Sequence, residues 1–173
     1  MLNYNICFVK RGDQILLLNR AKAPWMGCWN GIGGKLEPGE QPRAAMVREL
    51  EEETGIVDCS LTFKGIVTWT KNGANFGGMY LYLAEIPEHI EYETPRLTVE
   101  GILDWKSIDW ILNRSNQGLA ANIPESLERM MHDTDCYEHR CTYADGRLVE
   151  QHMLRISPLV ETEHGMITAL NTR

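Results

Sequence analysis

The chain has 173 residues, of which 43% are hydrophobic, and this size and composition suit one folded domain with one sizeable core. With 17 basic and 24 acidic residues, the formal net charge is -7, which opposes extended contact with a nucleic-acid backbone. We therefore expect no polymeric nucleic acid as a partner, and a polyphosphate substrate would need divalent cations to screen its charge.

The five cysteines show neither a CxxC spacing nor an even number, so the sequence predicts neither a zinc knuckle nor a disulfide framework. Residues 6–9 are too short for the apolar part of a signal peptide, and no apolar run approaches the length of a membrane span. We therefore expect a soluble, cytoplasmic protein with reduced thiols and no membrane partner, either a monomer or a homodimer.

In chain order, the first predicted elements are two strands, residues 4–10 and 14–20, which Arg11-Gly12-Asp13 joins as a hairpin. Residues 21–34 follow and combine several glycines with a proline and two tryptophans. Such a composition suits irregular backbone around aromatic anchors. The segment is a candidate binding loop.

The next predicted element is a helix that starts at Pro42 and stops before Gly55. Proline is tolerated in the first turn of a helix, glycine is a common C-terminal stop, and the residues between them are strong helix formers. Gln41 is a poor N-cap for this helix.

Along the rest of the chain, the sequence predicts a second hairpin (residues 61–70 and 79–86), a strand (97–105), a helical turn (107–112), a helix that starts at Pro124 and a closing hairpin (137–143 and 148–154). Asp145-Gly146 is a strong turn signal within the closing hairpin. Trp105 and Trp110 are expected to be core anchors. The fold class is therefore α+β with antiparallel character.

Glutamates crowd one part of the predicted helix, residues 49–53. At roughly 100° per residue, three of them fall together on one flank, namely Glu49, Glu52 and Glu53. The apolar stripe beside them is Met46, Val47, Leu50 and Thr54. Hard divalent cations prefer oxygen ligands, so the cluster suits Mg²⁺ or Mn²⁺. A solvated acidic surface is the alternative, and Glu51 is expected to be solvated.

The residue spacing around this cluster is more specific than the charge run. The chain resembles the Nudix box at every defining position, which are Gly34, Glu40, Arg48, Glu49, Leu50, Glu52, Glu53, Gly55 and Ile56. The resemblance implies the Nudix fold, a mixed β-sheet sandwiched between α-helices, over residues 1–156. Residues 157–173 are expected to form a C-terminal tail that is either disordered or docked on the surface.

The same resemblance implies roles for residues of the box. Glu49, Glu52 and Glu53 would bind metal from the helix, and the carbonyl of Gly33 would bind it from the preceding loop. Glycine suits this place, because the absence of a side chain lets backbone approach an ion closely. Arg48 would position a neighbouring glutamate rather than contact the metal.

Two roles remain open between several carboxylates. Glu100 resembles the glutamate that several family members supply from a strand outside the box as a metal ligand or base, but it could equally be a surface charge. A carboxylate must take the proton of the attacking water, and Glu49 is the first candidate, ahead of Glu100 and Glu53.

Glu40 would hold the loop against the helix.

The loop sequence Trp29-Asn30-Gly31-Ile32-Gly33-Gly34-Lys35 resembles the entry loop of enzymes that sanitise oxidised purine nucleoside triphosphates. Asn30 would then bind the base, because an amide has both a donor and an acceptor, although it could instead only cap the turn that follows it. Asn5 and Arg20 would line the nucleoside side of the pocket or be ordinary strand residues. Lys35 would contact a phosphate or pair with a glutamate.

The expected activity is Mg²⁺-dependent hydrolysis of a nucleoside triphosphate to monophosphate and pyrophosphate, with 8-oxo-dGTP or a related oxidised purine nucleotide as substrate. The acidic pair that reads the oxidised base in the mammalian enzymes is absent from residues 118–124, where Asn122 is the candidate replacement. The alternatives are an ADP-ribose or dinucleoside polyphosphate pyrophosphatase and a domain that senses a nucleotide without cutting it. Residues 71–73 lack the proline or tyrosine often associated with those pyrophosphatases.

Overall fold

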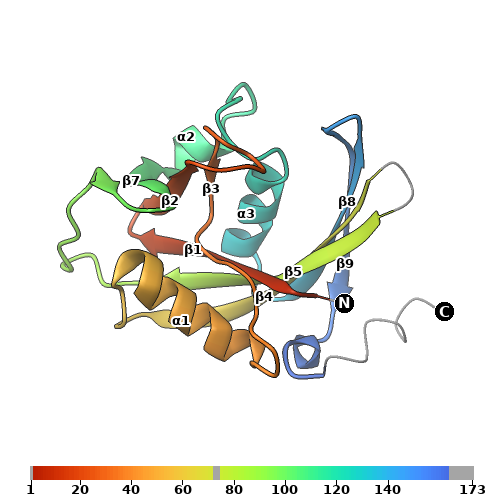
Figure 1. The fold of residues 1–173 in the computed structure, drawn as a ribbon, viewed down its shortest axis with the longest axis horizontal. Helices are drawn as coiled ribbons and strands as arrows, with labels where there is room; N and C mark the ends of the chain where they lie inside the picture. The colour runs from red at the N-terminus through yellow and green to blue at the C-terminus, as the bar shows by residue number, and fades with distance from the viewer. Residues whose placement is uncertain (1, 72–74, 164–173) are drawn as a thin grey trace.

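The computed structural model describes residues 2–71 and 75–163, and residues 1, 72–74 and 164–173 lie outside it. Its elements are β1 (Tyr4–Arg11), β2 (Gln14–Arg20), β3 (Trp29–Asn30), α1 (Pro42–Thr54), β4 (Ser60–Lys71), β5 (Asn75–Glu85), β6 (Arg96–Leu97), β7 (Gly101–Ser107), α2 (Ile108–Leu112), α3 (Ile123–His132), β8 (Cys136–Ala144), β9 (Arg147–Ile156) and the 3₁₀ helix η1 (Pro158–Glu161). The strands form one sheet in the order β6-β7-β2-β1-β5-β4-β8-β9, with β3 paired to β2 (Figure 1).

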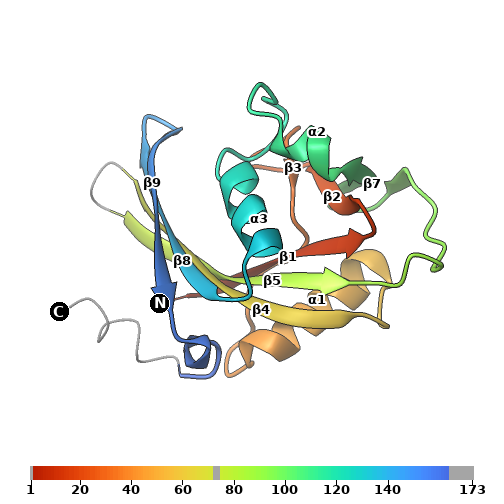
Figure 2. The ribbon, with the colours of Figure 1, turned by 180° about the vertical axis from the view of Figure 1, so that it is seen from behind.

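The sheet is mixed because its hairpins are linked by two long-range parallel pairs. The hairpins expected from the sequence are present, with β1 antiparallel to β2, β4 to β5 and β8 to β9. In contrast, β1 is parallel to β5, and β4 is parallel to β8. Opposite views show α1 against one face of the sheet and α3 against the other (Figures 1 and 2). The expected fold, a mixed sheet between helices, is confirmed.

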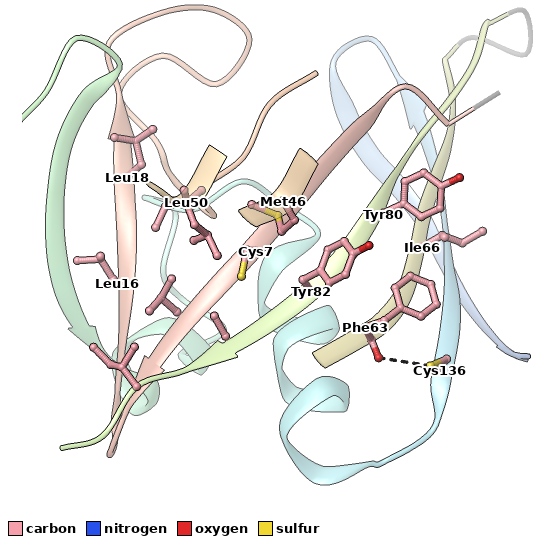
Figure 3. Close-up of a cluster of buried hydrophobic side chains, with 14 of the residues drawn as sticks. Cys7, Leu16, Leu18, Met46, Leu50, Phe63, Ile66, Tyr80, Tyr82 and Cys136 are labelled. Atoms are coloured by element: carbon pink, nitrogen blue, oxygen red, sulfur yellow. Dashed lines mark hydrogen bonds between the residues drawn. The ribbon is translucent and has the colours of Figure 1, made fainter. Parts of the chain in front are cut away.

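Apolar side chains form a cluster on each face of the sheet. Under α1, Met46 and Leu50 pack into the same cluster as Tyr82 of β5 (Figure 3). Under α2 and α3, the second cluster includes Ile111 and Leu127. Burial of one large apolar side chain contributes about 1.5–3 kcal/mol. These clusters therefore hold the helices on the two faces.

Helix α1 begins and ends where the sequence predicts. Pro42 lies in its first turn, and Gly55 adopts a left-handed conformation (φ 77°) directly after its last residue. Gln41 makes no side-chain cap hydrogen bond, which agrees with the prediction. The first turn therefore has no side-chain cap of its own.

The apolar stripe predicted for α1 is correct for Met46, Leu50 and Thr54, which are buried. It is wrong for Val47, which is 49% exposed. The buried residues follow i,i+4 spacing along the helix, and Val47, about 100° around the axis from Met46, lies at the edge of this row. The helix therefore buries a narrower face than the sequence suggests.

The single strand predicted over residues 97–105 is wrong, because the chain turns back on itself between β6 and β7. The side-chain oxygen of Thr98 accepts hydrogen bonds from the N–H groups of Glu100 and Gly101, which stabilises the turn. Gly101 has φ +148°, and a Cβ there would collide with the carbonyl oxygen of Asn19. Glu100 therefore lies in a turn and not within a strand.

Only one of the two expected tryptophan anchors is part of the core. Trp105 packs against the cluster under α1, and its indole N–H donates to the carbonyl of Tyr92 at 3.1 Å. Trp110 is 38% exposed, so the prediction is wrong for this residue. In the short helix α2, Ile111 is the buried residue, and Trp110 precedes it on the outer side.

The segment after β9 is docked on the sheet as far as the structure describes it. Ser157 caps η1 by accepting a hydrogen bond from the N–H of Leu159. Val160 is 4% exposed and belongs to the cluster under α1. The remainder of the expected tail, residues 164–173, lies outside the described residues.

None of the five cysteines forms a disulfide. Within residues 2–71 and 75–163, no helix is long and apolar enough to cross a membrane.

Three polar side chains, from α3, β8 and β9, form a hydrogen-bonded cluster that includes the buried His139. The hydroxyl of Ser126 lies 3.2 Å from Nδ1 of His139, and the amide of Gln151 donates to that hydroxyl at 3.2 Å. His139 is fully buried, and its Nε2 has no partner among the described residues. Burial, with a smaller effect of Arg129, lowers the pKa of His139 from 6.5 to about 4.

This pKa predicts a pH-dependent contribution to stability. The unfolded chain binds the proton below pH 6.5, whereas the folded chain binds it only near pH 4, so stability present above pH 6.5 is lost as the pH falls toward 4. The loss is at most about 3 kcal/mol. Urea unfolding from about pH 7.5 to about pH 4.5 should show it in the wild type and not in His139→Gln. His152→Gln, which replaces an exposed histidine, sets the baseline, and equal pH slopes in all three proteins would contradict the prediction.

Candidate active site

The glycine loop lies between two strands that separate. Strands β1 and β2 pair only where residues 9–11 lie opposite residues 14–16. Beyond that point the loop takes the place of β2 beside β1, because Asn5 N–H donates to the carbonyl of Gly34 at 2.9 Å and Cys7 N–H to that of Ile32 at 2.7 Å. The loop is thus held as an additional strand segment next to the start of β1.

Gly33 and Gly34 are closely packed glycines of this loop. Gly33 has φ +147°, and a Cβ on it would collide with the carbonyl oxygen of Asn5. A Cβ on Gly34 would lie 2.5 Å from Oε1 of Glu49. The absence of side chains therefore lets the loop backbone lie directly against β1 and against the glutamates of α1.

Arg48 is the centre of the hydrogen-bond network between this loop and α1. Its Nε and Nη2 bind the two carboxylate oxygens of Glu40 at 2.9 and 3.0 Å. Its Nη1 binds Glu49 at 2.9 Å and Glu52 at 3.1 Å. Glu40 also accepts from the N–H of Glu37 at 2.9 Å. The arginine therefore connects three carboxylates and ties the loop to the helix.

Glu53 has no contact with Arg48 and lies on the loop side of α1. The backbone N–H of Gly33 lowers the pKa of its carboxylate, while its Oε2 is buried and has no partner among the described residues. Burial, with the neighbouring charges of Glu49 and Glu100, raises the pKa of Glu53 to about 7, although Gly33 and Arg20 act in the opposite direction. Glu49 and Glu100 are paired with Arg48 and Lys22, so among these three described carboxylates Glu53 is the one without an ion-pair partner.

The helix flank brings the three predicted metal ligands to one side, but they are not arranged as a ready site. Among residues 2–71 and 75–163, no three acid, histidine or cysteine side chains are placed to hold an ion. Arg48 holds Glu49, whose side chain is 12% exposed, and Glu52, whose side chain is 60% exposed. Both would have to rotate away from the guanidinium to join Glu53.

Glu100 reaches the same region from the turn before β7. Its carbonyl accepts from the N–H of Ala21 at 2.9 Å, and its carboxylate pairs with Lys22 at 3.0 Å. Its charge contributes to the raised pKa of Glu53. The structure thus places a fourth predicted carboxylate near the helix, although Lys22 binds it at the surface.

The residues predicted to bind substrate lie around the loop. Asn5 is 3% exposed; its Oδ1 accepts from Gly34 N–H at 3.1 Å, and its Nδ2 has no partner among the described residues. Asn30 accepts from the N–H of Gly31 at 2.9 Å, the turn-capping contact that was the alternative to its predicted base-binding role. Arg20 donates to the carbonyl of Pro24 at 2.9 Å. The carbonyl of Lys35 accepts from Arg48 at 3.3 Å.

Distant parts of the chain also border the loop. Trp29 N–H donates to the carbonyl of Gly118 at 2.7 Å, which places the segment before α3 beside β3. Trp25 lies edge-to-face against Tyr143 of β8, with ring centroids 6.2 Å apart. The hydroxyl of Tyr143 is 3.5 Å from Oδ1 of Asn122. No local pattern links Tyr143 to a loop more than a hundred residues earlier.

Comparison with known proteins assigns this arrangement to a family. A family model of the NUDIX domain matches residues 2–122. The chain belongs to the Nudix family. Among its relatives, it is similar to a Nudix hydrolase of Bacillus subtilis, YvcI, which has no characterised activity and is 26% identical over 151 residues that cover 85% of this chain and 94% of the relative.

Other similar proteins differ in the reactions that their names describe. A MutT protein from Bacillus halodurans superposes with a TM-score of 0.72 at 28% identity and covers 87% of this chain and 95% of its own. A CTP pyrophosphohydrolase of Escherichia coli is 44% identical over 57 residues, which are 32% of this chain and 42% of that protein. The chain is therefore a Nudix hydrolase, a family that generally uses divalent cations such as Mg²⁺, and the box does not by itself select the substrate.

Arg48 and Glu40 should be energetically coupled in this Nudix hydrolase. Arg48→Lys cannot keep both contacts with Glu40 and should lower the free energy of unfolding by about 1–3 kcal/mol. A double-mutant cycle with Glu40→Gln, followed by urea unfolding, measures the coupling. Lys10→Gln, which breaks the 3.4 Å pair with half-exposed Glu85, should change stability by less than about 1 kcal/mol. A coupling near zero between Arg48 and Glu40 would refute the prediction.

Proposed function

We propose that the chain hydrolyses a purine nucleoside triphosphate, 8-oxo-dGTP or a related oxidised nucleotide, to nucleoside monophosphate and pyrophosphate with Mg²⁺. The observation that carries the proposal is the buried oxygen of Glu53, which has no partner among the described residues. A buried carboxylate beside other acids is unfavourable unless a cation compensates its charge. A divalent metal ion would supply that charge.

The donor atoms available around Glu53 fit a hard divalent cation. The ion would be held by Glu49, Glu52 and Glu53, by the carbonyl of Gly33 and by Glu100. All of these are oxygen donors, which Mg²⁺ prefers and which also suit Mn²⁺ as a substitute. Such ions, when bound, offset the charge of a triphosphate and make a bound water more acidic.

A side chain must also accept the proton of the water that attacks phosphorus. Glu49 is our first candidate, because burial raises the pKa of its carboxyl. Glu53 and Glu100 follow it. Attack of the water breaks one P–O bond of the triphosphate chain and releases pyrophosphate. We assign Lys35 to a substrate phosphate.

Two amides support a nucleoside site next to the triphosphate. The Nδ2 group of Asn5 is buried without a partner among the described residues, so a ligand acceptor would satisfy it. Asn30 lies on β3, and the segment that leads to Asn122 runs beside that strand. Amides offer both a donor and an acceptor to a purine edge. Arg20, at the end of β2, is assigned to the same side.

The metal role of Glu53 predicts a loss of turnover without a loss of stability. Glu53→Gln should lower kcat by about 10²–10³-fold, as does the loss of one electrostatic contact in other active sites. Its melting temperature should not fall, because the variant removes an uncompensated buried charge. Glu51→Gln, on the exposed side of α1, is the matched control and should remain active. A fully active Glu53→Gln would refute the site.

Substrate choice is tested by product analysis with Mg²⁺ across oxidised and normal nucleoside triphosphates, ADP-ribose and dinucleoside polyphosphates. Pyrophosphate release should be fastest from 8-oxo-dGTP, and Asn30→Ala should raise KM for it about tenfold, as expected for one lost hydrogen bond. Asn113→Ala, which also removes an amide that accepts a backbone N–H, is the control. Faster cleavage of ADP-ribose or a dinucleoside polyphosphate would favour that alternative. Nucleotide binding with no cleavage across the panel would favour the sensor alternative.

A further inference from the structure

The N-terminal turn of α1 is bound by the segment that follows the sheet. Arg43 contacts Glu161 of η1 through Nε and Oε1 at 2.8 Å and through Nη2 and Oε2 at 3.1 Å. The hydroxyl of Tyr82 donates to Oε1 of Glu161 at 3.1 Å. The Nη1 group of Arg43 donates to the carbonyl of Leu61 at 2.9 Å. We call Arg43, Tyr82 and Glu161 the clasp, and it joins α1, β4, β5 and η1.

The clasp is partly shielded from water. The side chain of Glu161 is 14% exposed, and its neighbour Val160 lies in the same apolar cluster as Leu50 of α1. Both ribbon views show η1 beside the N-terminal end of α1 (Figures 1 and 2). Burial, with the carboxylate of Glu161, raises the pKa of Tyr82, so its hydroxyl keeps its proton and donates. A two-pronged arginine–carboxylate contact of this kind is stronger than an ordinary surface ion pair.

The two ends of α1 are held by different parts of the chain. At the C-terminal end, the hydroxyl of Tyr92 and the guanidinium of Arg96 donate to the carbonyl of Thr54 at 2.9 and 3.1 Å. At the N-terminal end, Gln41 provides no side-chain cap, and the buried Met46 is a flexible side chain that tolerates small shifts. The clasp therefore supplies a directional contact between the N-terminal end of α1 and the sheet.

We propose that Arg43 and Glu161 are positioning residues that hold α1 in the orientation that brings Glu49 and Glu53 to the Gly33 loop. This inference rests on the proposed function, in which these glutamates bind the cation. The glutamates project from α1, whereas Gly33 belongs to another element, so a small rotation of α1 changes the distance between them. Displacements of about 1 Å can lower turnover by about 10²-fold.

Neither positioning residue is one of the defining residues of the family. Arg43 occupies none of the defining positions of the box, and Glu161 lies beyond residues 2–122, which the family model matches. The clasp couples the C-terminal segment of the chain to the helix that carries the box glutamates.

The test uses Glu161→Gln, Arg43→Gln and the double variant in the full chain. Mn²⁺ binding is measured without nucleotide by electron paramagnetic resonance, and kcat and KM are measured with the preferred triphosphate. Each single variant should weaken Mn²⁺ binding and lower kcat by about tenfold, and the double variant should lose no more than either one, because both break the same contact. KM should change little, since neither residue touches the substrate.

Two further variants make the result decisive. Arg155→Gln breaks the 2.7 Å ion pair with Asp135 near the end of β9 and should leave Mn²⁺ affinity and kcat at wild-type values. Arg43→Lys keeps a positive charge and should restore part of both, and it replaces Arg43→Gln if that variant does not fold. Clasp variants with a lower melting temperature but wild-type Mn²⁺ affinity and kcat would overturn the proposal. If the wild type binds Mn²⁺ but cleaves no nucleotide, the proposed function fails, and the Mn²⁺ affinities still decide the role of the clasp.

Discussion

The structure around the box depends on the contact of one guanidinium with three carboxylates. Arg48 binds Glu40, Glu49 and Glu52 at 2.9–3.1 Å, so repulsion along the helix is offset for these groups but not for Glu53. Through Glu40 the same guanidinium fixes the glycine loop, since Glu40 also holds the backbone of Glu37. One positive charge thus sets both the shape of the loop and the place where charge remains uncompensated.

The sheet provides the second constraint, because β1 has different partners along its length. Its end pairs with β2, and its start pairs with the glycine loop. This exchange of partners brings Gly33 and Gly34 against the helix, where a Cβ on either would collide with a neighbour. Strand pairing and the small size of glycine therefore place the loop backbone beside the carboxylates of α1.

Local signals in the sequence predicted what local structure determines. Proline and glycine marked both ends of α1, Asp145-Gly146 marked the β8–β9 turn, and the spacing of the box marked the acidic flank. Burial of Val47 and Trp110 was predicted incorrectly, because periodicity shows which residues share a face but not how wide the covered part of that face is. The prediction of one strand over residues 97–105 was wrong because the chain turns at Gly101, which lies against the backbone of Asn19 in β2.

Contacts between distant residues could not be predicted from the sequence. Arg43 and Glu161 are 118 positions apart, and neither stands in a pattern that suggests a partner. The same applies to the Trp25 and Tyr143 pair. The chemistry of the site could be inferred from the box, whereas the parts that orient it depend on tertiary structure.

The two parallel strand pairs also have a consequence for how the chain acquires its activity. Residue 4 lies opposite residue 79, and residue 65 lies opposite residue 137. Neither strand pair can form until more than seventy further residues have been synthesised. Helices with strong local propensity form on a much shorter timescale than such non-local pairing. We therefore expect α1 to form only transiently on the ribosome, because a 13-residue helix without a side-chain N-cap is marginal in isolation. It becomes part of a working enzyme only when the late strands close the sheet beneath it.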